Sequence, residues 1–250
     1  MSSLSFKQYG QGKPIILLHG FPMNQNVWND FAPLLSDTYK VITVDLPGFG
    51  KSPLPQLPFT IDQVADSLIT WLSSENILGS TVIGHSLGGY VALAMVEKRP
   101  ELFTGLGLFH STALADSEEK KESRLKVVDF IAKNGVLAFT SNFIPPLFAH
   151  QNHIAIASVR NMAVQSTHDA VLGYTLAMRN RPDRTSLLKK LKIPVLFLAG
   201  EVDPGIPVDS ILSQSKLCKS AQVHVLKQVA HMGMFEKPEA SMLIIRAFVG

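Results

Sequence analysis

Apolar residues along this chain follow two spacings that alternate with each other. Short continuous apolar runs are followed by longer segments in which apolar residues recur at every third or fourth position. The runs predict strands at Leu4–Tyr9, Pro14–Leu18, Lys40–Val44, Ser80–Gly84, Leu106–Phe109, Val195–Ala199 and Gln222–Leu226. The longer segments predict helices at Val27–Leu35, Ile61–Ser74, Leu87–Lys98, Val208–Leu217 and Lys237–Val249. This alternation predicts an α/β fold, with a mainly parallel twisted sheet and helices on both of its faces.

The stretch between the fifth and sixth predicted strands breaks the alternation. Its apolar spacing predicts only helices, at Asp116–Lys133, Gly135–Ser141, Asn152–Gln165 and His168–Met178. A loop of this length without structure would be improbable in a compact domain. We therefore divide the chain into a core, residues 1–111 and 186–250, and an inserted helical cap, residues 112–185.

Composition excludes several classes of protein. Hydrophobic residues make up 46% of the chain, but no apolar run approaches the roughly 18 residues of a membrane helix. The net charge of +3 is dispersed, which disfavours a nucleic-acid partner. The single cysteine, Cys218, excludes an internal disulfide. With no signal-peptide pattern at residues 1–7, we expect a cytoplasmic protein.

A serine lies where a strand meets a helix. Ser86 occupies the centre of Gly84-His85-Ser86-Leu87-Gly88, directly after one predicted strand and before a predicted helix. Glycines two residues on either side fit a turn in which strand and helix backbones approach closely. This context is typical of a nucleophile elbow, in which the serine hydroxyl is presented at the tip of the turn.

Two further loops supply the groups that such a serine needs. Asp203 and His231 each follow a predicted strand, where functional groups collect in open α/β sheets. A histidine could remove the proton of the Ser86 hydroxyl, and a carboxylate could orient that histidine. Glu201 and Asp209 are alternative acids. The other histidines are weaker candidates for the base: His19, His85, His110, His150, His153, His168 and His224.

No metal or cofactor site is expected. The histidines and carboxylates lack the H-E-x-x-H spacing, and one cysteine cannot form a cysteine pair. The glycines of residues 47–52 lack the spacing of a phosphate-binding loop.

Two more loops carry a family resemblance. His19-Gly20-Phe21-Pro22-Met23 resembles the HGxP loop of the α/β-hydrolase superfamily, and residues 45–52 resemble its DxxGxGxS loop. The chain order of Ser86, Asp203 and His231 is also that of this superfamily. We identify the chain as similar to its small, capped, serine esterase-like members.

The resemblance implies roles for further residues. The backbone N–H groups of Phe21 and Leu87 would form the oxyanion hole. His19, His85 and Asp45 would shape their own loops, and the inserted helices would cover Ser86. In related enzymes an aspartate replaces the nucleophilic serine, but here the turn carries Ser86.

The inserted helices offer side chains for a substrate pocket. We expect an apolar acyl group to contact Phe21, Phe139, Phe143, Leu147 and Met162. The arginines of this segment are either ordinary surface charge or a means of recognising a carboxylate: Arg124, Arg160, Arg179, Arg181 and Arg184.

The resulting hypothesis is a serine hydrolase that cleaves small to medium apolar carboxylic esters through an acyl-enzyme. Two alternatives stay open. The same three groups could serve C–C bond hydrolysis, a lyase step or perhydrolysis on an acidic substrate. The fold could also serve as a ligand receptor without catalysis. The expected partner is a small-molecule ester, and neither nucleic acid nor a membrane is expected.

Overall fold

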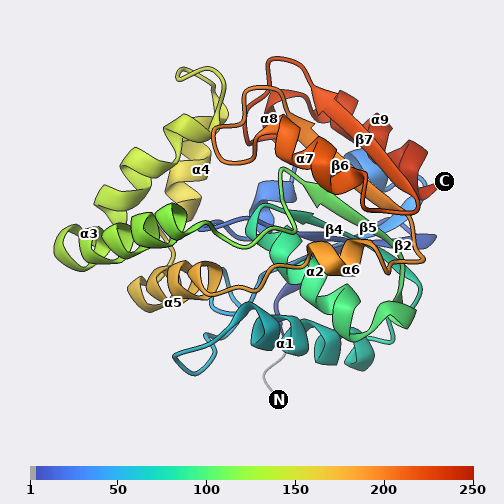
Figure 1. Ribbon diagram of the computed structural model, residues 1–250, viewed down its shortest axis with the longest axis horizontal. Coiled ribbons are helices and arrows are strands. Elements are labelled where there is room, and N and C mark those ends of the chain that lie inside the picture. The colour runs from blue at the N-terminus through green and yellow to red at the C-terminus, as the bar shows by residue number, and fades with distance from the viewer. Residues whose placement is uncertain (1–3) are drawn as a thin grey trace.

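The computed structural model describes residues 4–250, which form one open sheet with helices around it (Figure 1). Residues 1–3 lie outside the described residues. They belong to the predicted core and to the segment 1–7 in which no signal-peptide pattern was found. The strand order is β1-β3-β2-β4-β5-β6-β7, and all neighbours are parallel except β1 and β3. The strands are β1 Phe6–Tyr9, β2 Lys13–Leu18, β3 Tyr39–Val44, β4 Ser80–His85, β5 Phe103–Phe109, β6 Val195–Gly200 and β7 Ala221–Leu226. The predicted α/β fold is therefore confirmed.

Each face of the sheet is buried under its own layer. Successive side chains of a strand point to opposite faces, so Ile16 and Leu18 of β2 enter one core cluster and Ile15 and Leu17 enter another. The first cluster contains the apolar faces of α1 (Ile61–Ser74) and α2 (Leu87–Lys98), and the second contains that of α9 (Pro238–Val249). Burial on both faces explains why these strands have continuous apolar sequences.

The helical segment lies between β5 and β6 and projects to one side of the sheet (Figure 1). It contains α3 (Glu118–Phe143), α4 (Ala155–Ala163), α5 (His168–Arg179) and the short α6 (Thr185–Leu188). Its two ends meet, because the Arg184 N–H donates to the Ala113 carbonyl at 2.8 Å. Arg184 then pairs with Asp62 at 2.6 Å and Glu97 at 2.8 Å, which joins this end to α1 and α2. We refer to this segment as the helical insertion.

A glycine divides the longest helix of the insertion. Gly135 has φ 79° and ψ 170°, a conformation that is essentially restricted to glycine. The predicted helices 116–133 and 135–141 are therefore two arms of α3 that meet at a kink. The kink turns the second arm, and both arms can face the same space above the sheet.

Several predicted boundaries are corrected by the structure. The predicted helix Val27–Leu35 is wrong: the segment forms two short 3₁₀ turns, Gln25–Trp28 and Ala32–Leu35. Pro33 cannot donate a backbone hydrogen bond, which interrupts a continuous helix. β5 begins at Phe103 rather than Leu106, because Thr104 and Gly105 hide its apolar pattern.

Other boundaries differ at the ends of elements. β1 begins at Phe6 rather than Leu4, and the predicted helix at 152–165 is shortened to α4. The predicted helix 208–217 ends two residues early as α7 (Val208–Ser215). The predicted helix 237–249 begins one residue later as α9 and is preceded by α8 (Gly233–Glu236), which the sequence did not indicate.

The α1 prediction is confirmed in detail. The helix spans Ile61–Ser74, and Thr60 and Gln63 form the reciprocal hydrogen bonds of a capping box. Among residues 4–250, none of the helices has both the length and the apolar character needed to cross a membrane.

Candidate active site

Ser86 occupies a strained turn between β4 and α2. Its φ of 50° and ψ of −113° lie outside the conformations that non-glycine residues ordinarily adopt. The turn is held by two hydrogen bonds, from the Ser86 N–H to the Phe109 carbonyl at 3.0 Å and from Ser111 Oγ to the Ser86 carbonyl at 2.7 Å. A Cβ on Gly84 would come within 2.2 Å of the Gly88 backbone, which explains the glycine there.

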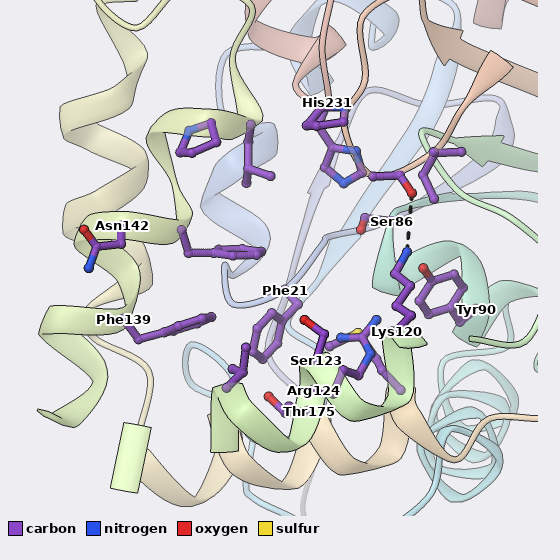
Figure 2. Close-up of a pocket in the computed structure, with 18 residues that line it drawn as sticks. Phe21, Ser86, Tyr90, Lys120, Ser123, Arg124, Phe139, Asn142, Thr175 and His231 are labelled. Carbon is purple, nitrogen blue, oxygen red and sulfur yellow. Dashed lines mark hydrogen bonds between the residues drawn. The ribbon is translucent and has the colours of Figure 1, made fainter. Parts of the chain in front are cut away.

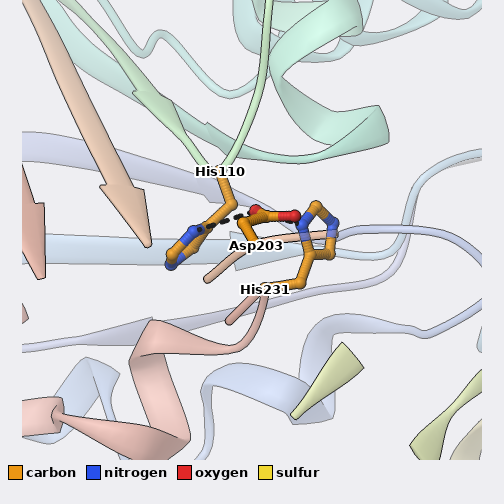
Figure 3. Close-up of side chains that lie close together, drawn as sticks. All are labelled: His110, Asp203 and His231. Carbon is orange, nitrogen blue, oxygen red and sulfur yellow. Dashed lines mark hydrogen bonds and ion pairs between the residues drawn. The ribbon is translucent and has the colours of Figure 1, made fainter. Parts of the chain in front are cut away.

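Asp203 and His231 are hydrogen-bonded to each other (Figure 3). His231 Nδ1 lies 2.7 Å from Asp203 Oδ2. The other carboxylate oxygen accepts the Gly205 and Ile206 N–H groups at 2.8 and 3.1 Å, so the turn after β6 orients the carboxylate. Burial alone would raise the pKa of Asp203, but the imidazoles of His231 and His110 outweigh it and hold that pKa well below its usual range.

His110 faces the same carboxylate from the other side, a contact that the sequence did not indicate (Figure 3). The Gly233 N–H donates to His110 Nε2 at 3.2 Å, so this nitrogen carries no proton. Burial lowers the pKa of His110, which favours the neutral imidazole. The proton of that neutral ring then lies on Nδ1, which is 3.4 Å from Asp203 Oδ2. His110 therefore presents an N–H group to Asp203.

Ser86 and His231 line one cavity of about 380 Å³ beneath the helical insertion (Figure 2). This volume is within the range of small-molecule sites. Four of the predicted pocket residues also line the cavity, namely Phe21, Phe139, Phe143 and Leu147.

The fifth predicted pocket residue, Met162, lies elsewhere. It is on α4 and packs against the core cluster that contains Phe148 and Val159. Met162 is absent from the lining of this cavity, so the structure gives the expectation that it contacts the substrate no support. A methionine at helical spacing can face either neighbour of its helix, and here it faces the core.

The backbone N–H groups of Phe21 and Leu87 are available for a ligand. In the part of the chain that the structure describes, neither donates to a protein acceptor. Close glycine contacts bring their segments together. A Cβ on Gly20 would lie 2.5 Å from His85 Nδ1, and one on Gly88 would lie 2.4 Å from the Leu18 carbonyl oxygen.

His19 and His85 bond to backbone groups of neighbouring loops. His19 Nε2 accepts the Leu46 N–H at 3.0 Å, and His85 Nε2 donates to the His231 carbonyl at 2.8 Å. Asp45 accepts the Gln25 N–H at 2.8 Å and the Lys51 N–H at 3.0 Å. Through these hydrogen bonds all three side chains stabilise the loops around the site, as the family resemblance implies.

The two alternative acids face other partners. Glu201 accepts the Gln228 N–H at 2.9 Å on the surface, and Asp209 lies in the first turn of α7. Neither lines the cavity.

Glu236 holds the His231 loop against the insertion, a role that the sequence analysis missed. One carboxylate oxygen accepts the Ala230 and Met232 N–H groups at 3.0 and 3.2 Å. The other accepts the Ala149 N–H at 2.7 Å. The signal that could have revealed it is an acid five residues after His231, within reach of the backbone of the same turn.

Most arginines of the insertion have structural partners. Arg181 and Arg184 pair with buried or half-buried acids, Arg160 donates to Ser141, and Arg179 donates to Asn180. Arg124 alone of the five lines the cavity, together with Lys120, which the sequence analysis did not single out.

One group of side chains in the described residues is arranged as the ligands of a metal ion could be. Ligand atoms of His110, Asp203 and His231 lie within 4.8 Å of one another. The proton on His110 Nδ1, which follows from the Gly233 contact, occupies the position that a metal would need. The group fits a hydrogen-bonded His231–Asp203 pair with a neutral imidazole beside it better than a set of metal ligands.

Comparison with protein families matches residues 15–241 to the model of the alpha/beta hydrolase family. The chain is 29% identical over 266 residues to a pimeloyl-[acyl-carrier protein] methyl ester esterase of Aeromonas hydrophila, covering 99% of this chain and 100% of the relative. It is 24% identical over 246 residues to a 2-hydroxy-6-oxo-6-(2'-aminophenyl)hexa-2,4-dienoic acid hydrolase of Metapseudomonas resinovorans, covering 94% of this chain and 83% of the relative.

A solved structure is also similar over nearly the whole chain. The thermophilic esterase from Thermogutta terrifontis, determined with malate bound, superposes with a TM-score of 0.93 at 31% identity, covering 98% of this chain and 92% of that one. The fold and family predictions are confirmed, and the protein belongs to the alpha/beta hydrolase family.

Proposed function

We propose that this hydrolase cleaves carboxylic esters through an acyl-enzyme formed on Ser86. The observation that carries the proposal is that Ser86, presented on a strained turn, lines the same cavity as His231, whose Nδ1 is bonded to Asp203 at 2.7 Å. Nucleophile, base and orienting carboxylate are the parts that acyl transfer by a serine requires. The esterases among the relatives support the same chemistry.

In the first half-reaction, Ser86 Oγ attacks the ester carbonyl carbon and His231 Nε2 takes the hydroxyl proton. The C–O bond to the alcohol then breaks, and His231 returns the proton to the departing alcohol oxygen. In the second half-reaction, water attacks the acyl-enzyme, with His231 again taking and returning one proton. Asp203 keeps the proton of His231 on Nδ1, which leaves Nε2 free to act as the base.

The two unpartnered amides fit the oxygen of the reacting carbonyl. That oxygen gains negative charge in the tetrahedral intermediate, and the N–H groups of Phe21 and Leu87 would donate to it. Leu87 is the first residue of α2, so the positive end of the helix dipole adds to its effect. Loss of one such donor typically lowers kcat by about 10²–10³.

The helical insertion acts in this proposal as a cap. Its α3 supplies Phe139 and Phe143 to the cavity wall, and the following turn supplies Leu147. These apolar side chains favour an apolar acyl or alkyl group and limit water around the reacting carbonyl. The Leu147 carbonyl accepts the His231 N–H at 2.9 Å, so the cap also supports the base.

A second candidate is hydrolysis of a C–C bond next to a carbonyl. The similarity to a dienoic acid hydrolase favours it, since that relative is 24% identical over 94% of this chain. The two candidates differ in whether simple esters are turned over.

A panel of p-nitrophenyl esters from acetate to octanoate tests the proposal. We expect multiple turnovers with at least one short or medium ester, preceded by a burst of nitrophenol. In Ser86→Ala, kcat should fall by about 10⁶, because nucleophile and base act as one unit. Ser213→Ala removes a hydroxyl from an exposed position of α7, away from the cavity and from the Ser86 turn, and serves as the control with unchanged kcat. Full activity of Ser86→Ala would overturn the proposal, and no turnover of any ester would favour the second candidate.

A further inference from the structure

Two cationic side chains line the cavity beside Ser86. Lys120 and Arg124 line it, and its lining in the described chain includes neither an aspartate nor a glutamate side chain. Figure 2 shows Lys120, Ser123 and Arg124 gathered on one side of the space and Phe139 on the other. A concave site lined by cations alone attracts anions.

Arg124 is oriented by a buried carboxylate that it shares with a second arginine. Its Nε donates to Asp116 Oδ2, and Arg181 Nη1 lies 2.8 Å from Asp116 Oδ1. The Asp116 side chain is fully buried. Asp183 also interacts electrostatically with Arg181, so the two guanidinium groups face two carboxylates and Lys120 is the cavity cation that has no acid partner among the described residues.

The remaining donors of Arg124 are free to bind a ligand. Within residues 4–250, only its Nε donates a hydrogen bond to protein, and its side chain is 16% exposed. The two terminal nitrogens form the planar fork that matches a carboxylate. Because Asp116 fixes Nε, the fork is held in place before any ligand arrives.

Lys120 lies one helical turn before Arg124, on the same face of α3. Its ammonium group donates to the Gly205 carbonyl at 3.3 Å, and no carboxylate of the described residues lies within ion-pair distance of it. An ammonium has three donors, so the Gly205 contact leaves donors for an anion. The neighbouring Lys121 differs, because it pairs with Glu118 at 2.7 Å and does not line the cavity.

We propose that Lys120 and Arg124 form an anion subsite, and that the preferred substrates are esters carrying a carboxylate remote from the ester group. The inference rests on the proposed ester hydrolysis and names its substrate class. Phe21 would contact the methylene chain between the reacting carbonyl at Ser86 and the carboxylate at the cations, and the stacked rings of Phe139 and Phe143 form the opposite wall. The carboxylate could belong to the acyl part or to the alcohol part of the ester.

Matched substrate pairs test the subsite and identify the side that carries the charge. One arm compares monomethyl esters of dicarboxylic acids, from succinate to suberate, with methyl esters of monocarboxylic acids of equal length. The other arm compares acetyl esters of ω-hydroxy acids with acetyl esters of the matching alkanols. At one chain length in one arm, we expect kcat/KM for the charged ester to be about tenfold higher or more, the effect of one charge-assisted hydrogen bond.

Variants of α3 then locate the preference. The ratio of kcat/KM for charged and neutral esters should fall toward one in Lys120→Met and below one in Lys120→Glu, and Lys120→Arg should retain the preference. Lys121→Met removes the same charge from the same helix outside the cavity and should leave the ratio unchanged. A wild-type protein that hydrolyses neutral esters without any preference for charged ones would overturn the subsite, as would a preference that survives in Lys120→Glu.

A binding measurement separates the subsite from the chemistry. Monomethyl adipate should raise the melting temperature of Ser86→Ala more than methyl hexanoate does, because only the former carries a carboxylate, and the difference should vanish in Ser86→Ala/Lys120→Glu. If esters are not hydrolysed but monomethyl adipate still stabilises the protein more than methyl hexanoate, the ester proposal fails and the anion subsite stands. If neither probe stabilises the protein, the subsite is wrong even where esters are turned over.

Discussion

One oxygen of Asp203 faces two imidazole rings, and the different surroundings of the two rings determine their parts. His231 is bonded to this oxygen at 2.7 Å and lines the cavity, whereas His110 is fully buried at 3.4 Å. Gly233, two residues after His231, donates to His110. His110 therefore joins the ends of β5, β6 and β7, and we infer that it positions Asp203 without touching substrate.

This inference makes a prediction for His110. His110→Ala should lower kcat by about 10–10²-fold with little change in KM, because a misplaced Asp203 no longer orients His231. His110→Gln can both accept from Gly233 and donate toward Asp203, so it should recover part of kcat. Steady-state kinetics on a p-nitrophenyl ester measures both. Equal loss in the two variants, with unchanged melting temperatures, would contradict the positioning role.

At the scale of residues, the sequence indicated the proposed reacting groups better than their supports. Ser86, Asp203 and His231 lie in recognisable turn contexts, so their loops were predictable. His110, Glu236 and Lys120 were not, because their importance depends on contacts between segments far apart in the chain. The packing of the partly buried Met162 against a core cluster, away from the cavity lining, depends on the same kind of contact.

At the scale of elements, the kink at Gly135 determines the shape of the cavity. Residues before it supply Lys120 and Arg124, and residues after it supply Phe139 and Phe143. The sequence analysis also divides the segment here, into predicted helices at 116–133 and 135–141. The two 3₁₀ turns after β2 were not predictable in this way, since their apolar spacing also fits a helix.

The backbone conformation at the kink predicts the effect of substituting Gly135 by alanine. A Cβ on Gly135 would meet no atom within 4 Å, so Gly135→Ala acts only through backbone strain. We expect it to lower the free energy of unfolding by about 1–3 kcal/mol, or to rotate the second arm of α3 and raise KM. Asn134→Ala, at the adjacent exposed position, should change stability by about 0.5 kcal/mol or less. Urea unfolding and ester kinetics measure both effects, and a fully active, fully stable Gly135→Ala would contradict the account.

At the scale of the whole molecule, three buried histidines make folding depend on pH. Burial lowers the pKa of His19 to about 4, lowers that of His85 well below its usual value, and lowers that of His110. In the unfolded chain each titrates near about 6.5. Below that pH the unfolded state binds more protons than the native state, so the stability contributed by these neutral rings is lost as pH falls toward their folded pKa values.

We therefore expect the free energy of unfolding to decrease steadily between about pH 7 and pH 5, by up to about 1.4 kcal/mol per pH unit for each buried histidine. His19→Gln keeps a donor and an acceptor for its loop contacts and should flatten this dependence. His150→Gln, at an exposed position, should leave it unchanged. Urea titrations across this range provide the measurement, and identical slopes in His19→Gln and the wild type would contradict the assignment.

The central claim is that Ser86 is the nucleophile, and mapping a covalent adduct tests it most directly. The intact wild-type protein would be treated with a fluorophosphonate and digested, and the modified peptide identified by mass spectrometry. The account predicts one adduct, on Ser86, with labelling slowed in His231→Ala and absent in Ser86→Ala. An adduct on another residue, or ester turnover that persists while Ser86 stays unmodified, would contradict it.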